Sequence, residues 1–302
     1  MRMLGLVIVL LGAFTGLRGQ TAAASLRVLY LGNSLTDGND VPGLVQAMAE
    51  LQGVRLESVT VAPGGYALED HWRDNHQTLL WDRHFDVLVL QQGPSTLPES
   101  QLNLRVWATR WANEARRFGT EPALYMVWPV RTQANGFDLV AESYRNAAIA
   151  AEAALFPAGE AWEHVLQADS SIGLYSSDDL HATPAGSFLA AMVIARGLVA
   201  LDPTKVPAQV AGITVPAATL ARFRTAVVAI EARSWAGPGV PSGPTPPAPS
   251  AVNPAPPATA GGSGGGGAPS GWFLLALATA ATIRRPGQRG PDPVGVERGA
   301  RF

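Results

Sequence analysis

The sequence predicts an α/β domain with one parallel sheet of five strands, and three observations support this fold class. Between residues 25 and 235 of the 302-residue chain, short apolar runs alternate strictly with longer amphipathic segments. Such alternation builds a parallel sheet that is covered by helices on both faces. Polar residues directly follow the first apolar run, as they do where strands end at a ligand site. The two chain ends differ in composition, which leaves about 210 residues for one well-buried core.

Five apolar runs have the length and composition of buried strands. In chain order they span residues 26–31, 55–62, 85–90, 123–128 and 154–158, and the last is the weakest. The segments between and after these runs have helix-like composition. They span residues 41–51, 68–81, 100–118, 139–153, 185–200 and 217–235.

The amino-terminal end predicts export. Residues 1–24 begin with Arg2, continue through an apolar stretch at 4–17 and finish with three alanines. A basic start, a short apolar core and a small-residue exit are typical of a secretory signal peptide, with cleavage after Ala24. The alternative is a membrane anchor, but the apolar run is shorter than the roughly 20 residues that a spanning helix needs.

The carboxy-terminal end predicts a linker followed by a sorting or anchoring segment. Residues 236–270 carry no charge and are dominated by Pro, Gly, Ala and Ser, a composition that cannot form a core. Within residues 271–302, an apolar stretch precedes Arg284 and Arg285, which resembles the bacterial GlyGly-type surface-sorting signals. That resemblance implies export machinery and a sorting protease as partners, and a secreted or surface-associated bacterial protein. A short tail anchor or a disordered tail remains the alternative.

Composition excludes several kinds of chemistry. The chain has no cysteine, which rules out disulfides, thiol catalysis and cysteine-based zinc sites. The net charge of −2 argues against nucleic acid as a partner, because no basic face can neutralise phosphates. His71, His76 and His84 do not have a recognisable metal-ligand spacing. No phosphate-cradling Gly-x-x-x-x-Gly-Lys motif is present. We therefore expect neither a metal nor a cofactor.

The first candidate site residue is Ser34, in the segment Gly-Asn-Ser-Leu-Thr that follows the first predicted strand. Ligands bind parallel sheets outside the carboxyl ends of the strands, so Ser34 is well placed for catalysis. The alternative is that Ser34 caps a helix. Asn39 and Asp40 already stand before Val41 and Pro42, where the next helix is expected to begin, so Ser34 is not needed as a cap.

The second candidate segment places Asp178 three residues before His181. Thr183 as a helix cap and Pro184 in the first turn would leave His181 on the preceding loop, facing a cleft. Asp178 could then accept a hydrogen bond from the imidazole Nδ1 and fix its tautomer. Asp179 is the alternative acid. With Ser34, these residues supply a nucleophile, a base and an orienting acid, which suffice for acyl transfer.

Ser34 in a Gly-Asn-Ser-Leu motif near the mature amino terminus, with Asp178 and His181 in an Asp-x-x-His motif, resembles the SGNH (GDSL-type) hydrolases. The resemblance covers residues 25–200. It implies a flavodoxin-like three-layer α/β/α sandwich and hydrolysis of esters, often acetyl or acyl esters of sugars, lipids and small molecules. α/β-Hydrolases use the same order of residues, but their elbow is Gly-x-Ser-x-Gly, and Thr36 stands where its second glycine would be.

The same resemblance implies an oxyanion hole formed by backbone and side-chain donors. The Ser34 amide supplies one donor, and the segment Pro-Gly-Gly after the second strand makes Gly65 the candidate for another. Family members usually carry a third motif, or third block, of the form Gly-x-Asn-Asp after the third strand, and its asparagine side chain is an oxyanion donor. That asparagine is replaced in this sequence. On alignment at Gly93, Ser95 takes its place, although the Gln92 amide could reach the same space.

These residues predict an exported serine esterase that uses Ser34, His181 and Asp178. His71 and Trp72, which follow the glycine pair, are candidates for substrate contact. The expected partner is an ester-bearing small molecule, glycan or lipid. The alternative is a non-catalytic surface-displayed binding protein on the same fold, and the altered third block is the reason to retain it.

Overall fold

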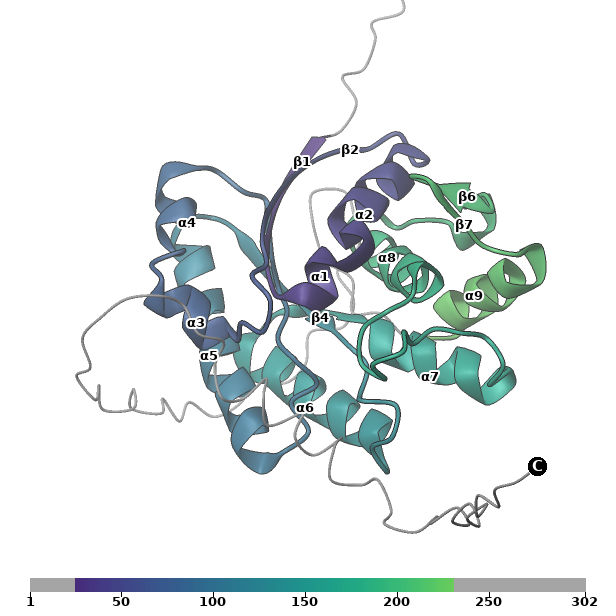
Figure 1. The fold of residues 1–302 in the computed structure, drawn as a ribbon. Coiled ribbons are helices and arrows are strands. Elements are labelled where there is room, and N and C mark those ends of the chain that lie inside the picture. The colour runs from purple at the N-terminus through teal and green to yellow at the C-terminus, as the bar shows by residue number, and fades with distance from the viewer. Residues whose placement is uncertain (1–24, 231–302) are drawn as a thin grey trace, which may run out of the picture.

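The computed structural model describes residues 25–230, which form one parallel sheet with helices on both sides (Figure 1). The sheet consists of β1 (Ser25–Leu31), β2 (Arg55–Val61), β3 (Val87–Leu90), β4 (Glu121–Met126) and β5 (Ala154–Pro157). Its strand order is β2-β1-β3-β4-β5, and every pairing is parallel. This is the flavodoxin-like order, which reverses direction between β1 and β3. The predicted α/β class and three-layer sandwich are confirmed.

The helices fall into two layers. Figure 1 shows α3 to α6 on one side of the sheet and α1, α2 and α7 to α9 on the other. Their bounds are α1 Ser34–Asp37, α2 Val41–Glu50, α3 Leu68–Arg73, α4 Thr78–Asp82, α5 Pro98–Arg117, α6 Gly136–Ala151, α7 Ala158–Ala168, α8 Pro184–Val199 and α9 Ala217–Ala229. Two short 3₁₀ segments, Gly38–Asp40 and Pro203–Lys205, complete the helical structure of the described residues.

The core is continuous through the sheet because its central strands are apolar on both faces. All four residues of β3 are buried, as are the last four of β1. Helix α8 is buried around most of its circumference because it packs between α2 and α7. The ends of β1 and β3 are therefore closely packed, so the loops that follow them start from well-ordered positions.

The main differences between the structure and the sequence prediction lie in four places. The segment at 68–81, predicted as one helix, forms α3 and α4, because Asn75 adopts a left-handed conformation with φ of 60° between them. Helix α7 and a small antiparallel pair, β6 (Gln209–Val210) with β7 (Ile213–Thr214), were not predicted. Strand β4 begins and ends two residues earlier than the apolar run indicated.

The predicted signal peptide at 1–24, the linker at 236–270 and the sorting segment at 271–302 lie outside the described residues. Among residues 25–230, no helix has both the length and the hydropathy needed to cross a bilayer.

Candidate active site

Ser34 is the first residue of α1, immediately beyond the carboxyl end of β1. The helix cap is Asn33, whose side-chain oxygen accepts a hydrogen bond from the Leu35 amide at 3.0 Å. Ser34 is thus not a cap, as expected, although a short helix does begin here before the one at Val41. Asp40 caps that second helix through the Gly43 amide at 3.0 Å. The Ser34 side chain is half-buried and therefore within reach of a ligand.

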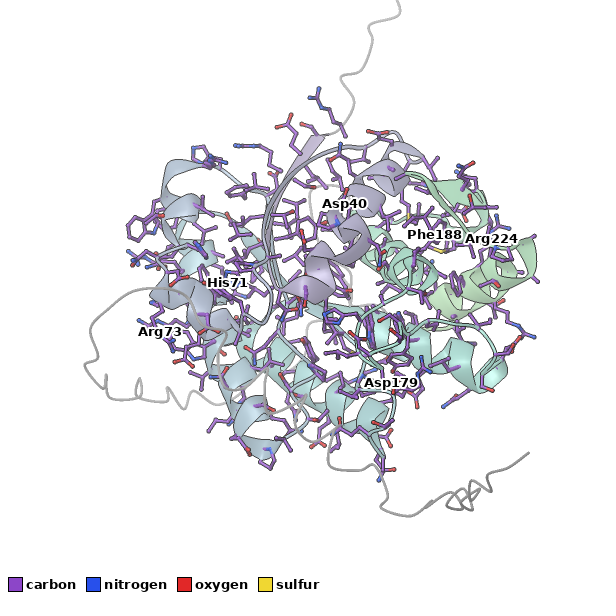
Figure 2. All side chains as sticks on the ribbon, in the orientation of Figure 1. Asp40, His71, Arg73, Asp179, Phe188 and Arg224 are labelled. Atoms are coloured by element: carbon purple, nitrogen blue, oxygen red, sulfur yellow. The ribbon has the colours of Figure 1, made fainter. Side chains whose placement is uncertain are left out.

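The structure brings Ser34, His181 and Asp178 together. The Ser34 Oγ lies 2.9 Å from the His181 Nε2, and the His181 Nδ1 lies 2.5 Å from the Asp178 Oδ2. A proton on Nδ1, donated to the carboxylate, leaves Nε2 free to accept the proton of the serine hydroxyl. Asp179, the alternative acid (labelled in Figure 2), instead pairs with Arg131 at 3.2 Å, and both of these side chains are partly exposed.

The Asp178 carboxylate is held as an anion. Partial burial alone would raise its pKa, but four hydrogen bonds outweigh that effect and place the pKa well below the usual range. They come from the His181 ring and from the Leu180 amide, the Ser176 hydroxyl and the His181 amide. The carboxylate therefore stays charged at any pH at which an imidazole is neutral.

The loop that carries His181 is held by three hydrogen bonds from two neighbouring segments. The indole of Trp128 donates to the Leu180 carbonyl at 2.8 Å, and the Arg131 amide donates to the Asp179 carbonyl at 2.9 Å. From the α1 side, the Asn39 side chain donates to the Ala182 carbonyl at 3.2 Å. The base and the nucleophile are thus joined by contacts beyond their own hydrogen bond.

Two backbone amides near Ser34 have no hydrogen-bond partner among the described residues. One is the amide of Ser34 and the other is the amide of Gly65. Gly65 has φ of 77°, a conformation that residues with a side chain adopt at a cost. Unpaired amides in a partly buried site can hydrogen-bond to a developing oxyanion.

The two third-block candidates differ in their hydrogen bonds. The side-chain amide of Gln92 is held in place because its Oε1 accepts a hydrogen bond from the Leu68 backbone amide at 3.1 Å. Its Nε2 lies 3.3 Å from the Ser95 Oγ. That nitrogen carries a second proton that has no acceptor in the described chain. The Ser95 hydroxyl instead donates to the Gly93 carbonyl at 3.0 Å. Of the two side chains, only that of Gln92 therefore keeps an N–H or O–H that no atom of residues 25–230 accepts.

The two residues suggested for substrate contact, His71 and Trp72, are packed against other parts of the protein. His71 is completely buried, and both of its ring nitrogens are engaged, one with the Gly32 carbonyl and one with His76. Trp72 packs edge-on against Trp111, with a ring-centroid distance of 5.1 Å, and beneath Arg110. None of its recorded contacts is with the residues around Ser34.

Sequence reasoning missed two residues that organise the site. Gln91 accepts from the Asn33 amide at 2.9 Å and from the Thr36 hydroxyl at 2.7 Å, and it donates to the Asn33 side chain at 3.0 Å. Asn33 in turn donates to the Tyr66 carbonyl at 2.9 Å. A buried glutamine that directly follows a wholly apolar strand was the available signal. Within residues 25–230, no group of three or more His, Asp or Glu side chains could hold a metal ion.

Comparisons with known proteins found similar solved structures but no matching family model or curated protein. A DUF4886 family protein from Bacteroides uniformis is similar in structure, with a TM-score of 0.58, 18% identity and coverage of 68% of this chain and 95% of that one.

Two further solved structures have lower TM-scores. A candidate SGNH hydrolase from Slackia heliotrinireducens is 28% identical, covers 57% of this chain and 98% of its own, and has a TM-score of 0.48. The esterase EstA from Pseudoalteromonas, with 15% identity over 56% of this chain and 93% of its own, has a TM-score of 0.42.

Proposed function

We propose that this chain is an exported serine esterase of the SGNH type that hydrolyses acetyl or short acyl esters. One observation carries the proposal: the His181 ring lies between the Ser34 hydroxyl at 2.9 Å and the Asp178 carboxylate at 2.5 Å. A serine bonded to a base that is oriented by an acid is the arrangement required for nucleophilic acyl transfer. The resemblance of the sequence motifs supports the same reading.

The proposed reaction has two halves. The Ser34 oxygen attacks the ester carbonyl while its proton passes to the His181 Nε2, and the imidazolium is stabilised by Asp178. The histidine then returns the proton to the leaving alcohol. Water attacks the acyl-enzyme by the same route, releases the acid and restores the serine.

The oxyanion that forms in each half is proposed to bind three donors. These are the amides of Ser34 and Gly65, which are unpaired within the described chain, and the free N–H of the Gln92 side chain. Because Gln92 is held through its own oxygen by the Leu68 amide, its donor is oriented before substrate arrives. Preorganised donors of this kind stabilise the transition state without reorganisation.

The second candidate is a binding protein that has kept the fold without turnover. The observation in its favour is that the Ser95 hydroxyl, which takes the place of the usual asparagine, donates to Gly93 and not toward a substrate. Loss of one oxyanion donor costs about 10²–10³ in rate, so turnover would be modest if Gln92 did not compensate.

A chromogenic short-chain ester separates the two functions. The purified protein should turn over p-nitrophenyl acetate, and Ser34→Ala should lose that activity. Ser177→Ala is the matched control, because Ser177 is an exposed serine on the loop that carries His181. A p-nitrophenyl phosphonate should add covalently to Ser34, as located by mass spectrometry of the digested protein. Equal rates for the wild type and Ser34→Ala would favour the binding protein.

Export is part of the proposal and rests on residues 1–24 and 236–302. Cleavage after Ala24 would begin the mature chain at Ser25, the first residue of β1. Expression in a Gram-negative host, followed by fractionation and amino-terminal sequencing, tests both the cleavage and the surface location. A full-length chain that stays in the cytoplasm would contradict the export proposal and leave the catalytic one intact.

A further inference from the structure

His71 is a buried histidine that the reaction does not use, yet it bonds directly to the loop of the nucleophile. Its Nε2 lies 2.8 Å from the Gly32 carbonyl oxygen, although the two residues are 39 positions apart in sequence. A carbonyl oxygen can only accept, so the His71 Nε2 must carry a proton. His71 is completely buried, whereas Arg73 of the same helix is exposed and lies near the edge of the molecule in Figure 2.

A second contact defines the state of the other nitrogen. The His71 Nδ1 lies 3.0 Å from the Nδ1 of His76, so one of the two nitrogens must donate and the other accept. Burial lowers the pKa of His71 to about 4, assisted by His76 and opposed by the Gly32 carbonyl and by Asp74. The His71 ring is therefore neutral at pH 7, with its proton on Nε2, and His76 is the donor.

The carbonyl that His71 holds belongs to the peptide bond between Gly32 and Asn33. The amide of the same peptide bond donates to the Gln91 Oε1 at 2.9 Å. The peptide is thus held at its oxygen by one side chain and at its nitrogen by another. The next peptide in the chain carries the Ser34 amide, and its orientation depends on the plane that the first one adopts.

We propose that His71 is a positioning residue, which aims the Ser34 amide and side chain by holding the Gly32 carbonyl, and that His76 sets the tautomer required. This inference rests on the proposed esterase function for its kinetic consequence but not for its structural one. His71 touches no reacting atom. It acts entirely through the loop between β1 and α1.

The kinetic test compares two substitutions that differ in one donor. His71→Gln keeps an N–H at the same number of bonds from the backbone, whereas His71→Leu removes it. Displacement of a catalytic group by about 1 Å costs roughly 10²-fold in rate, so His71→Leu should lower kcat ten- to hundredfold with little change in KM. His71→Gln should recover most of that loss. His84→Gln, the same change at an exposed histidine, should behave as the wild type.

Active-site titration distinguishes positioning from a loss of folded protein. Rates are divided by the number of serines that react with a p-nitrophenyl phosphonate, so unfolded molecules do not contribute. The proposal is overturned if kcat per titrated site is unchanged in His71→Leu, or if the glutamine variant loses as much as the leucine variant.

Nuclear magnetic resonance tests the structural step without any activity. In the wild type at pH 7, ¹⁵N–¹H correlations across the imidazole should place the His71 proton on Nε2. Hydrogen exchange of the Asn33 amide, which donates to Gln91, should be slower in the wild type and His71→Gln than in His71→Leu. A proton on the His71 Nδ1 alone, or a doubly protonated His71 ring, overturns the proposal. This measurement uses only the wild type, so it does not depend on whether the leucine variant folds. If the wild type hydrolyses esters no faster than Ser34→Ala, the proposed function fails. The resonance and exchange measurements would still decide whether His71 holds the Gly32 carbonyl.

Discussion

The side-chain amide of Asn33 donates to the carbonyl of Tyr66 at 2.9 Å, and this bond joins the two loops that carry the candidate oxyanion donors. Asn33 precedes the Ser34 amide, and Tyr66 follows the Gly65 amide. Because Asn33 is completely buried, the bond is not exposed to competition from water. The separation of the two donors is thereby fixed by a single side chain.

Asn33→Asp should damage the site without changing its size. The carboxylate keeps the oxygen that accepts from the Leu35 amide, but it turns a second oxygen toward the Tyr66 carbonyl in place of a donor. A buried acceptor without a donor costs about 1–3 kcal/mol of folding stability. Separation of the two loops should also lower kcat, by roughly 10²-fold for a shift of about 1 Å. Chemical denaturation and ester hydrolysis measure the two effects. Asn135→Asp, at an exposed helix start, is the control, and an equal loss there would contradict the prediction.

If Gln92 is the third donor, Gln92→Glu should lower kcat strongly, whereas Ser95→Gly should leave it nearly unchanged. Glutamate retains the oxygen that accepts from the Leu68 amide but loses both N–H groups, so kcat should fall by about 10²–10³. Ser95→Gly suits the positive φ of 54° at that position and removes a hydroxyl directed at Gly93, so kcat should change little. Steady-state kinetics on a short-chain ester distinguish the variants. A large loss in Ser95→Gly with none in Gln92→Glu would assign the donor to the serine.

The fold was predictable because its strands and helices alternate with distinct periodicities. The apolar run at 26–31 and the fully buried β3 fixed the sheet, and Thr183 with Pro184 marked the start of α8, where Thr183 caps the helix through the Gly186 amide. The break between α3 and α4 was not predictable from periodicity, because it depends on the left-handed Asn75. Helix α7 was missed because it follows β5 directly, with no loop residue between Pro157 and Ala158.

The residues of the candidate site could be predicted only where they belong to a short sequence motif. Ser34, Asp178 and His181 were identified, and the structure brings them together. The role of Gln91 could not be inferred from the sequence. Three of the four hydrogen bonds of its side chain are made with Asn33 and Thr36, at least 55 positions away, and the fourth is made with the adjacent Gln92. The bond from His71 to the Gly32 carbonyl could not be inferred either, because the two residues are 39 positions apart. A histidine near a glycine turn carries no mark in the sequence that distinguishes substrate contact from support of a distant carbonyl.

Trp128→Phe should loosen the loop that carries His181. The indole donates to the buried Leu180 carbonyl at 2.8 Å and stacks on Trp162 with centroids 3.6 Å apart. Phenylalanine preserves much of the stacking but leaves the carbonyl without its donor, which costs about 1–3 kcal/mol. Thermal unfolding should report that loss. Trp81→Phe, at an exposed tryptophan whose partner Glu114 keeps Arg117, should cost less. The reverse order would show that the Leu180 carbonyl does not depend on Trp128.

Asp178→Asn should nearly abolish turnover while it leaves the serine in place. The asparagine amide can donate to His181 and so favour the wrong tautomer, which costs roughly 10⁴-fold in kcat in triads of this kind. Asp179→Asn is the matched control, because it removes only a surface ion pair with Arg131, for which a loss of at most about 1 kcal/mol is expected.

The same substitution predicts a pH dependence of stability with a definite sign. The pKa of Asp178 in the folded protein lies below its unfolded value of about 3.9, so its carboxylate contributes stability at higher pH. That contribution is lost as the pH falls through the folded pKa. The wild type should therefore be more stable than Asp178→Asn at pH 7, and the difference should shrink steadily below about pH 4, where the unfolded chain takes up the proton. Urea denaturation at a series of pH values measures this difference. A gap that stays constant from pH 7 to pH 3 would show that the four hydrogen bonds to the carboxylate do not favour its charged form.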